Sequence, residues 1–233
     1  MMKMIPVPIP LLSQVPQPLH SIVESYWQDW SVACEENAIE FQSELPLEQL
    51  GKTWACSDFV ARNCIRYPQI FDALCKEGFQ LPRSLNDYQR LVAQAIESTS
   101  GDAQIMKTLR ELRQQEMLRI AWRDINALAN DEKILHELSD FAEAVVYVTT
   151  RALEQQQAII NGMPCDETGE AQELLTFAMG KMGGRELNFS SDIDLIFAYA
   201  EDGETPGPRR TSYNEFYLSV VRKLVKVLNE VTA

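Results

Sequence analysis

Two aspartates one residue apart, Asp192 and Asp194, are the residues of this 233-residue chain best suited to metal chemistry. The residues around them are β-prone, and successive side chains of a strand alternate between its two faces. The two carboxylates should therefore share a face, about 6.6 Å apart at about 3.3 Å per residue, with Ile193 and Leu195 buried opposite. Paired carboxylates suit a hard cation such as Mg²⁺ or Mn²⁺, which takes further ligands from phosphate oxygens. The spacing predicts a metal site with Asp192 and Asp194 as catalytic ligands.

A glycine-rich turn stands upstream of this pair. The apolar run Leu174 to Met179 predicts a buried strand, and the sequence GKMGG follows it at residues 180–184. Glycine lets backbone N–H groups approach a phosphate closely, and the start of a helix favours negative charge. We therefore expect the N–H groups near Gly183 and Gly184 to bind phosphate oxygens.

Two serines, Ser190 and Ser191, directly precede the aspartates, and one of their hydroxyls is expected to add a contact to phosphate. The order strand, Gly-Gly turn, short helix and Asp-x-Asp strand resembles the nucleotidyltransferase superfamily that includes DNA polymerase beta. The resemblance implies a third metal-binding acid on a later strand, after the helix that follows Asp-x-Asp. The chain ends at Ala233, within or just after that helix. We therefore expect a partial domain without the third carboxylate.

A longer run narrows the resemblance. The sequence GKMGGRELNFSSDIDLIF, at 180–197, strongly resembles the bacterial bifunctional glutamine synthetase adenylyltransferase/adenylyl-removing enzymes. The sequences LRELR at 109–113 and MLRIAWR at 117–123 are similar to the helical region of that family. The resemblance extends from about Ser57 to the last residue. The form LNFSSDID is similar to the N-terminal of the family's two nucleotidyltransferase domains, the one that removes AMP.

Several expectations follow from this resemblance. The parent enzyme should adenylylate glutamine synthetase with ATP and, at its N-terminal domain, remove AMP by phosphorolysis and release ADP. Glutamine synthetase is then the protein partner, the PII signalling protein a regulator of the parent, and Mg²⁺ or Mn²⁺ the cofactor. The fragment alone is expected to be inactive. Two alternatives stay open: another metal-dependent nucleotidyltransferase acting on a small molecule or protein, and a catalytically silent docking or regulatory domain.

Composition weighs against several classes of protein. The chain has 34 acidic and 21 basic residues, a formal net charge of −13. Affinity for DNA or RNA rests on Lys and Arg neutralising phosphates, so no nucleic-acid partner is expected. Prolines interrupt the apolar start, Met1 to Leu12, and no run is long enough to span a membrane, so we expect a cytoplasmic protein. Five cysteines without Cys-x-x-Cys spacing indicate reduced thiols rather than zinc ligands or disulfides.

Most of the chain around these residues has helical patterns, and we predict an α+β, mostly α fold. Residues 1–160 should form a helical region, and residues 161–233 a partial nucleotidyltransferase domain with a small sheet and flanking helices. Helices are predicted at about Leu19–Phe41, after Ser57, from Pro68 to Gly78, after Ser84, at about Asp102–Leu128 and Asp131–Gln157, and after a Ser212/Glu215 capping box. Strands are predicted at Leu174–Met179 and Asp192–Tyr199.

Four arginines fall at helical spacing on one predicted helix: Arg110, Arg113, Arg119 and Arg123. They could reach a phosphate, but Glu111 and Glu116 stand at spacings that allow ion pairs along the same helix. A structural, salt-bridged face is therefore the favoured prediction. Trp122, beside them, is expected in the core.

Overall fold

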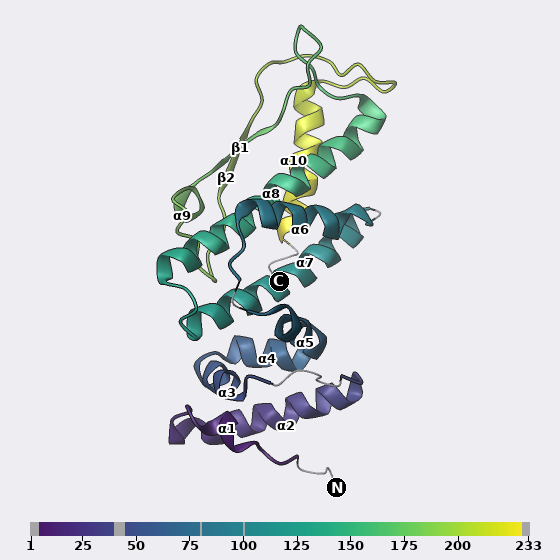
Figure 1. Ribbon diagram of the computed structural model, residues 1–233. Helices are drawn as coiled ribbons and strands as arrows, with labels where there is room; N and C mark the ends of the chain where they lie inside the picture. Colours follow the sequence, from purple (N-terminus) through teal and green to yellow (C-terminus); the bar gives the residue numbers. More distant parts are fainter. Residues whose placement is uncertain (1–4, 40–44, 80, 100, 230–233) are drawn as a thin grey trace. The chain divides into compact units, whose positions relative to one another are not determined.

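The structure is a computed structural model that describes residues 5–39, 45–79, 81–99 and 101–229 (Figure 1). The chain forms two compact units. The first contains Met1–Pro82 and Gln114–Ile134, and the second contains Arg83–Arg113 and Leu135–Ala233. The fold is mostly helical with a two-stranded antiparallel sheet, which confirms the predicted class. The predicted division near residue 160 follows the change from helices to strands and stays a prediction.

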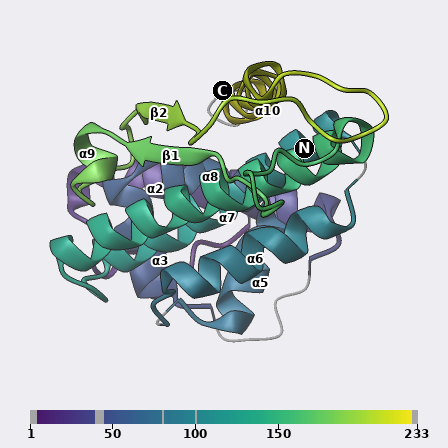
Figure 2. The ribbon, with the colours of Figure 1, turned by 90° about the horizontal axis from the view of Figure 1, so that it is seen from above.

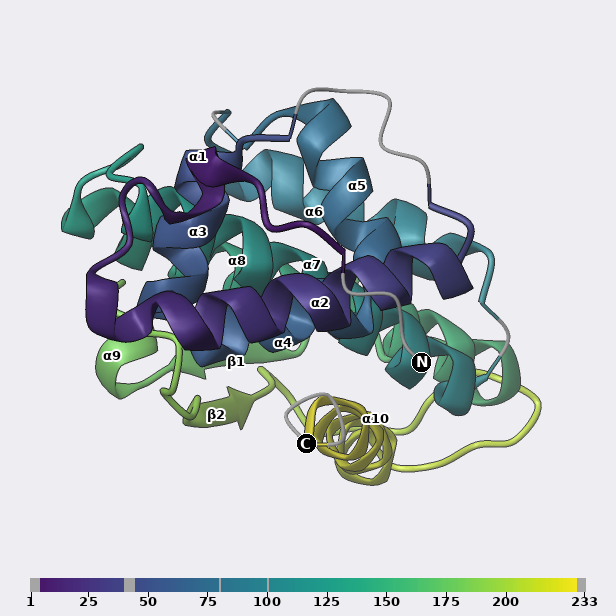
Figure 3. The same cartoon turned by 90° about the horizontal axis from the view of Figure 1, so that it is seen from below.

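The helices of the first unit are short except for one. They are α1 (Ile9–Leu12), a 3-10 turn (Gln17–Leu19), α2 (His20–Glu36), α3 (Leu47–Cys56), α4 (Asp58–Arg66) and α5 (Pro68–Glu77). Helix α2 packs against α3, α4 and α5 (Figure 3). Two long helices, α7 (Asp102–Ile125) and α8 (Asp131–Asn161), contribute residues to both units. No helix among the described residues is long and apolar enough to cross a membrane.

The predicted helix boundaries rest on caps that the structure confirms. The Ser57 hydroxyl accepts a hydrogen bond from the Val60 N–H at the start of α4 (3.3 Å). Pro68 occupies the first turn of α5, and Gly78 ends that helix with φ +86°, a conformation that glycine adopts without steric cost. The first predicted helix is shorter than expected: α2 ends at Glu36, and Phe41 lies outside the described residues.

An aromatic cluster forms the core of the first unit. The tryptophans Trp27, Trp30, Trp54 and Trp122 are all buried in it. The ring of Trp122 stacks on that of Phe79, with centroids 4.4 Å apart and planes 17° apart. The prediction that Trp122 lies in the core is confirmed.

Two of the four arginines of α7 are buried beside this cluster. Arg119 Nε donates to Glu116 Oε2 (2.9 Å), and Arg119 Nη1 donates to the Leu81 carbonyl (3.0 Å). Arg123 Nη1 donates to the Phe79 carbonyl (2.9 Å). The Arg119–Glu116 pair confirms the predicted ion pairing. Both arginines are only 2 % exposed, so they hold the chain after α5 onto α7.

The second unit is built on the second part of α8. Helix α10 (Tyr213–Asn229) buries Phe216, Val220 and Leu224 against Leu153 of α8, the apolar face that the sequence predicts. At its start the Glu215 N–H donates to Ser212 Oγ (3.2 Å). The predicted capping box is only half formed, because the Glu215 carboxylate instead accepts from Thr211 Oγ1 (2.6 Å). Helix α6 (Leu85–Glu97) also belongs to this unit.

The sheet of the second unit has two strands, β1 (Leu175–Ala178) and β2 (Leu195–Ala198), joined through the short helix α9 (Gly180–Gly183). Figure 2 shows the strands side by side, with α9 at one end. Phe177 lies opposite Ile196, and Ala178 opposite Leu195. Both strands are shorter than predicted, and the two aspartates precede β2 rather than lying inside it. Because the chain turns into α9 at Gly180 (φ +55°), β1 offers no partner beyond Met179.

Candidate functional site

The two aspartates lie where the chain enters β2. The Met179 N–H donates to the Asp194 carbonyl (2.9 Å), which extends the antiparallel pairing by one residue beyond the strands. Asp192 and Asp194 are exposed, whereas Ile193 and Leu195 are half-buried. This alternation is typical of extended chain with both carboxylates on one face. Ile193 and Leu195 are less buried than predicted, because a two-stranded sheet covers them only in part.

The face that carries the carboxylates is otherwise apolar. Ile196 follows Asp194 at the same two-residue spacing, and its strand partner is Phe177. Both side chains are 53 % exposed, and Met179, across from Asp194, is 46 % exposed. The carboxylates therefore border an exposed apolar surface.

The Gly-Gly turn has a steric cause. A Cβ atom at Gly183 would lie 2.4 Å from the Ala178 carbonyl oxygen, a distance that real side chains do not reach. At Gly184 the nearest atom, the Gly180 carbonyl oxygen, is 3.6 Å from such a Cβ. The N–H groups of Gly183 and Gly184 donate to the carbonyls of Met179 (3.2 Å) and Gly180 (3.0 Å). In this structure those two N–H groups are therefore occupied, and Gly183 serves to bring α9 close to β1.

A lysine reaches the segment that precedes the aspartates. Lys181 Nζ lies 3.5 Å from Ser191 Oγ, and that hydroxyl also donates to Asn188 Oδ1 (2.7 Å). Asn188 Oδ1 further accepts from the Ser190 N–H (3.2 Å). These contacts bring an ammonium group and two hydroxyls together in the stretch of chain that directly precedes Asp192. Asn188 was missed in the sequence, although Asn before Ser-Ser is typical of a side chain that bonds its own backbone two residues on.

Arg185 is a second residue that the sequence did not single out. Its guanidinium pairs with Asp140 and, at 3.3 Å from Nη1, with Glu143 Oε2, both on α8. The neighbouring Leu187 N–H donates to Ser139 Oγ, also on α8 (3.2 Å). These contacts attach the chain between the Gly-Gly turn and the aspartates to the helix beneath. Their partners lie more than 40 residues away, so no local pattern could reveal them.

The donor set fits a hard cation with an incomplete protein shell. Among the described residues no group of three His, Cys, Asp or Glu side chains is placed to hold a metal ion. Asp192 and Asp194 alone would supply two carboxylate oxygens on an exposed face. Mg²⁺ is commonly bound by one or two carboxylates, with water and substrate phosphate as the other ligands. The pair suits that role.

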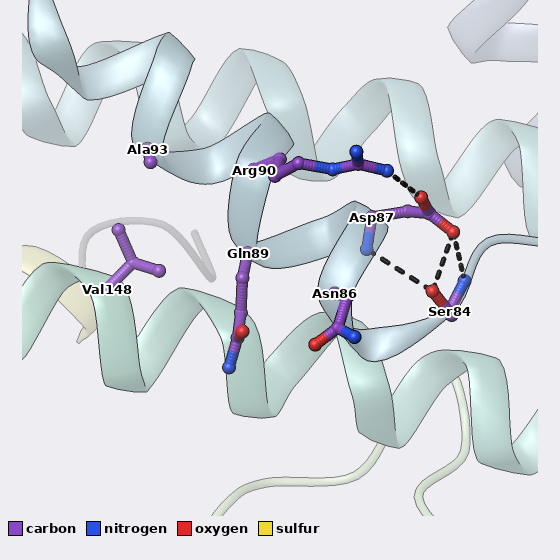
Figure 4. Close-up of a pocket in the computed structure, with 7 residues that line it drawn as sticks. All are labelled: Ser84, Asn86, Asp87, Gln89, Arg90, Ala93 and Val148. Atoms are coloured by element: carbon purple, nitrogen blue, oxygen red, sulfur yellow. Dashed lines mark hydrogen bonds and ion pairs between the residues drawn. The ribbon is translucent and has the colours of Figure 1, made fainter.

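Two of the hollows among the described residues lie in the second unit, and neither is lined by the aspartates. One of about 620 Å³ is lined by α8 and β1 and reaches Gly183 and Leu195. The other, of about 690 Å³, is a shallow depression beside the start of α6 (Figure 4). Its polar groups bond one another: Asp87 accepts from Ser84 and pairs with Arg90. Hydrogen bonds from Ser84 lower the pKa of Asp87 to about 2, which marks a helix cap rather than a reactive acid.

Comparison with known proteins identifies the family of this chain. The sequence profile of the glutamate-ammonia ligase adenylyltransferase family matches residues 47–233. A bifunctional glutamine synthetase adenylyltransferase/adenylyl-removing enzyme of Thioalkalivibrio sulfidiphilus is 36 % identical over 227 residues, covering 97 % of this chain and 23 % of its own length. The protein of the same description from Nitrosococcus oceani is 42 % identical over 190 residues, covering 80 % and 20 %.

The chain belongs to the glutamate-ammonia ligase adenylyltransferase family. The resemblance that the block at 180–197 carries is thereby confirmed at the level of the family. The chain spans about a quarter or less of the length of these curated relatives.

Proposed function

We propose that this chain carries the adenylyl-removing site of a bifunctional enzyme that acts on glutamine synthetase. The names of the relatives support glutamine synthetase as the protein substrate. The observation that carries the proposal is the pair of exposed carboxylates, Asp192 and Asp194, on one face of the chain entering β2, directly beside the α9 turn. An exposed site suits a substrate that is itself a folded protein.

The reaction is phosphorolysis of a phosphodiester. The resemblance implies that a tyrosine of glutamine synthetase carries the AMP group. An oxygen of inorganic phosphate forms a bond to the phosphorus of that group, the bond from the phosphorus to the tyrosine oxygen breaks, and ADP leaves while the tyrosine takes a proton. Asp192 and Asp194 would hold Mg²⁺ or Mn²⁺, which when bound neutralises charge on the nucleotidyl phosphate. Lys181 supplies a fixed positive charge near Ser191, and the exposed Ser190 hydroxyl can donate to a phosphate oxygen.

The test is made in the full-length gene product with Asp192→Asn and Asp194→Asn. Each variant should lower phosphate-dependent ADP release from adenylylated glutamine synthetase by about 10²-fold or more, because charge stabilisation of the transition state is lost. ATP-dependent adenylylation should stay nearly intact, since the resemblance implies a separate metal site for it. Asp202→Asn, an exposed carboxylate in the loop after β2, is the matched control and should leave both activities unchanged.

Two results would contradict the proposal. If both variants lost adenylylation and kept ADP release, this site would be the transferase. If neither activity changed, the aspartates would have no catalytic role.

Metal affinity gives a second, independent measurement. With two protein carboxylates, the 233-residue chain should bind Mn²⁺ or Mg²⁺ only weakly, with Kd of about a millimolar or higher. Calorimetry on the chain and on Asp194→Asn measures this directly. Micromolar affinity that Asp194→Asn abolishes would mean that another residue supplies a third ligand.

A further inference from the structure

Arg185 has an unusual backbone for its residue type. Its φ is +58°, in the left-handed region that glycine favours. Among the described residues only Ala38 and Ala127 share this property without being glycine. Each of the three ends a helix, and an arginine is the only one with a long side chain. Gly184 directly precedes Arg185. The left-handed conformation nevertheless falls on the arginine and not on the neighbouring glycine.

The three helix ends have the same hydrogen bonds. At α9 the Arg185 N–H donates to the Met182 carbonyl (3.1 Å), and the Glu186 N–H donates to the Lys181 carbonyl (2.7 Å). At α7 the Ala127 N–H donates to the Asp124 carbonyl (2.9 Å), and the Leu128 N–H to the Arg123 carbonyl (2.8 Å). The ends of α9 and α7 therefore need the same backbone conformation, and glycine would adopt it most easily. The side chain of Arg185 needs a reason beyond the cap.

That side chain binds two carboxylates one helical turn apart on α8. The planar fork of an arginine holds two acceptors in fixed directions, so it fixes position and orientation together. Asp140 is mostly buried, with 14 % of its side chain exposed, whereas the Arg185 and Glu143 side chains are about half exposed. With the Leu187 N–H on Ser139, the segment from the turn to the aspartates is attached to one face of α8.

We propose that Arg185 is a positioning residue for the reaction, which holds the α9 turn and Lys181 in place relative to Asp192 and Asp194. The inference rests on the proposed function. Arg185 acts through Asp140 and Glu143 and does not touch the reacting atoms. A shift of about 1 Å in a positioning group can cost about 10²-fold in rate.

Arg185→Gly separates this role from a structural one. Glycine keeps the cap and relieves the left-handed backbone, so the melting temperature should change by less than about 3 °C. The kcat for ADP release should fall about 10- to 100-fold, with kcat/KM falling by the same factor. Ala127→Gly is the matched control. It relieves the same left-handed backbone conformation at the same kind of helix end, without removing an ion pair. It should leave kcat unchanged.

A charge exchange tests the route through α8. Arg185→Asp and Asp140→Arg should each lower kcat, and the double variant should recover at least about tenfold over the weaker single variant, because it restores an ion pair across the same gap. If Arg185 contacted phosphate directly, the exchange would give no recovery, and Arg185→Lys would raise the KM for phosphate with kcat unchanged. Either result would overturn the positioning role.

The two proposals fail separately. Loss of ADP release in Asp192→Asn together with full kcat in Arg185→Gly would overturn only the positioning role. Full activity in Asp192→Asn would overturn the proposed site itself. If the double variant does not fold, the comparison of Arg185→Gly with Ala127→Gly still decides, since equal kcat in these two contradicts the inference.

Discussion

The two neighbouring glycines of the α9 turn, Gly183 and Gly184, differ in the space available for a side chain. Gly183 lies against the Ala178 carbonyl, where a methyl group has no room, whereas Gly184 has ordinary space around it. From the sequence both were predicted to bind phosphate through their N–H groups. That role stays a prediction. The structure adds a packing role for Gly183, which depends on the path of β1 and is absent from any local pattern.

We expect the two alanine substitutions to differ. Gly183→Ala should destabilise the second unit by about 1–3 kcal/mol, because the added methyl forces α9 away from β1. Gly184→Ala should stay within about 0.5 kcal/mol, since its φ of −81° suits alanine. Thermal unfolding followed by tyrosine absorbance measures both. Equal melting temperatures for the two variants would show that α9 can move without cost.

Residue spacing predicted part of the site. The shared face of Asp192 and Asp194 follows from the two-residue period of extended chain, and their exposure pattern agrees with it. Arg185 could not be found in this way, because Asp140 and Glu143 lie in a different element. Lys181 stands in the predicted turn, and only the fold shows it beside Ser191.

At the scale of elements, helices were predicted better than strands. Caps and prolines mark helix ends locally, as Ser57 and Pro68 do. The strands were overestimated because β-prone residues continue past the point where the partner strand turns away at Gly180. Strand length depends on the partner, which lies elsewhere in the sequence.

Helix α7 shows what helical spacing leaves open. Its arginines were predicted on a salt-bridged face, yet Arg119 and Glu116 form a buried pair. We expect Arg119→Ala to destabilise the first unit by about 3–5 kcal/mol, because it leaves the Glu116 carboxylate buried without this partner. The double variant Glu116→Leu with Arg119→Met should cost much less, since it removes both charges.

Lys107→Ala is the control for this prediction, because Lys107 pairs with Glu111 on the exposed side of the same helix. It should change the free energy of unfolding by less than about 1 kcal/mol. Urea unfolding of the three variants gives the comparison. A loss in Arg119→Ala no larger than in Lys107→Ala would mean that Glu116 is adequately solvated without its arginine.

At the scale of the whole molecule, the two units interleave along the chain. Each is assembled from two separate stretches, joined through α7 and α8. The predicted boundary near residue 160 follows the change from helices to strands, and it stays a prediction. The assignment of residues to a compact unit depends on contacts between distant segments, such as those of Trp122 with Phe79.

The cysteines allow a test of the first unit's core. Burial raises the pKa of the Cys64 thiol to about 12, so almost none of it is thiolate at neutral pH, whereas Cys56 is exposed. We expect a thiol reagent at pH 7.5 to modify Cys56 rapidly and Cys64 only after unfolding, as peptide mass analysis would show. Rapid modification of Cys64 in the folded protein would contradict the packing of this core.

The placement of the tryptophans has a spectroscopic consequence. All four, Trp27, Trp30, Trp54 and Trp122, belong to the first unit, while the aspartate pair lies in the second. Tryptophan emission therefore records the unfolding of one unit without a contribution from the other, and far-ultraviolet circular dichroism records both. A chain whose two transitions coincide unfolds as one cooperative body, and a chain whose transitions separate consists of two thermodynamic units. The sequence thus carries a natural reporter that distinguishes damage to the helical core from damage to the candidate site.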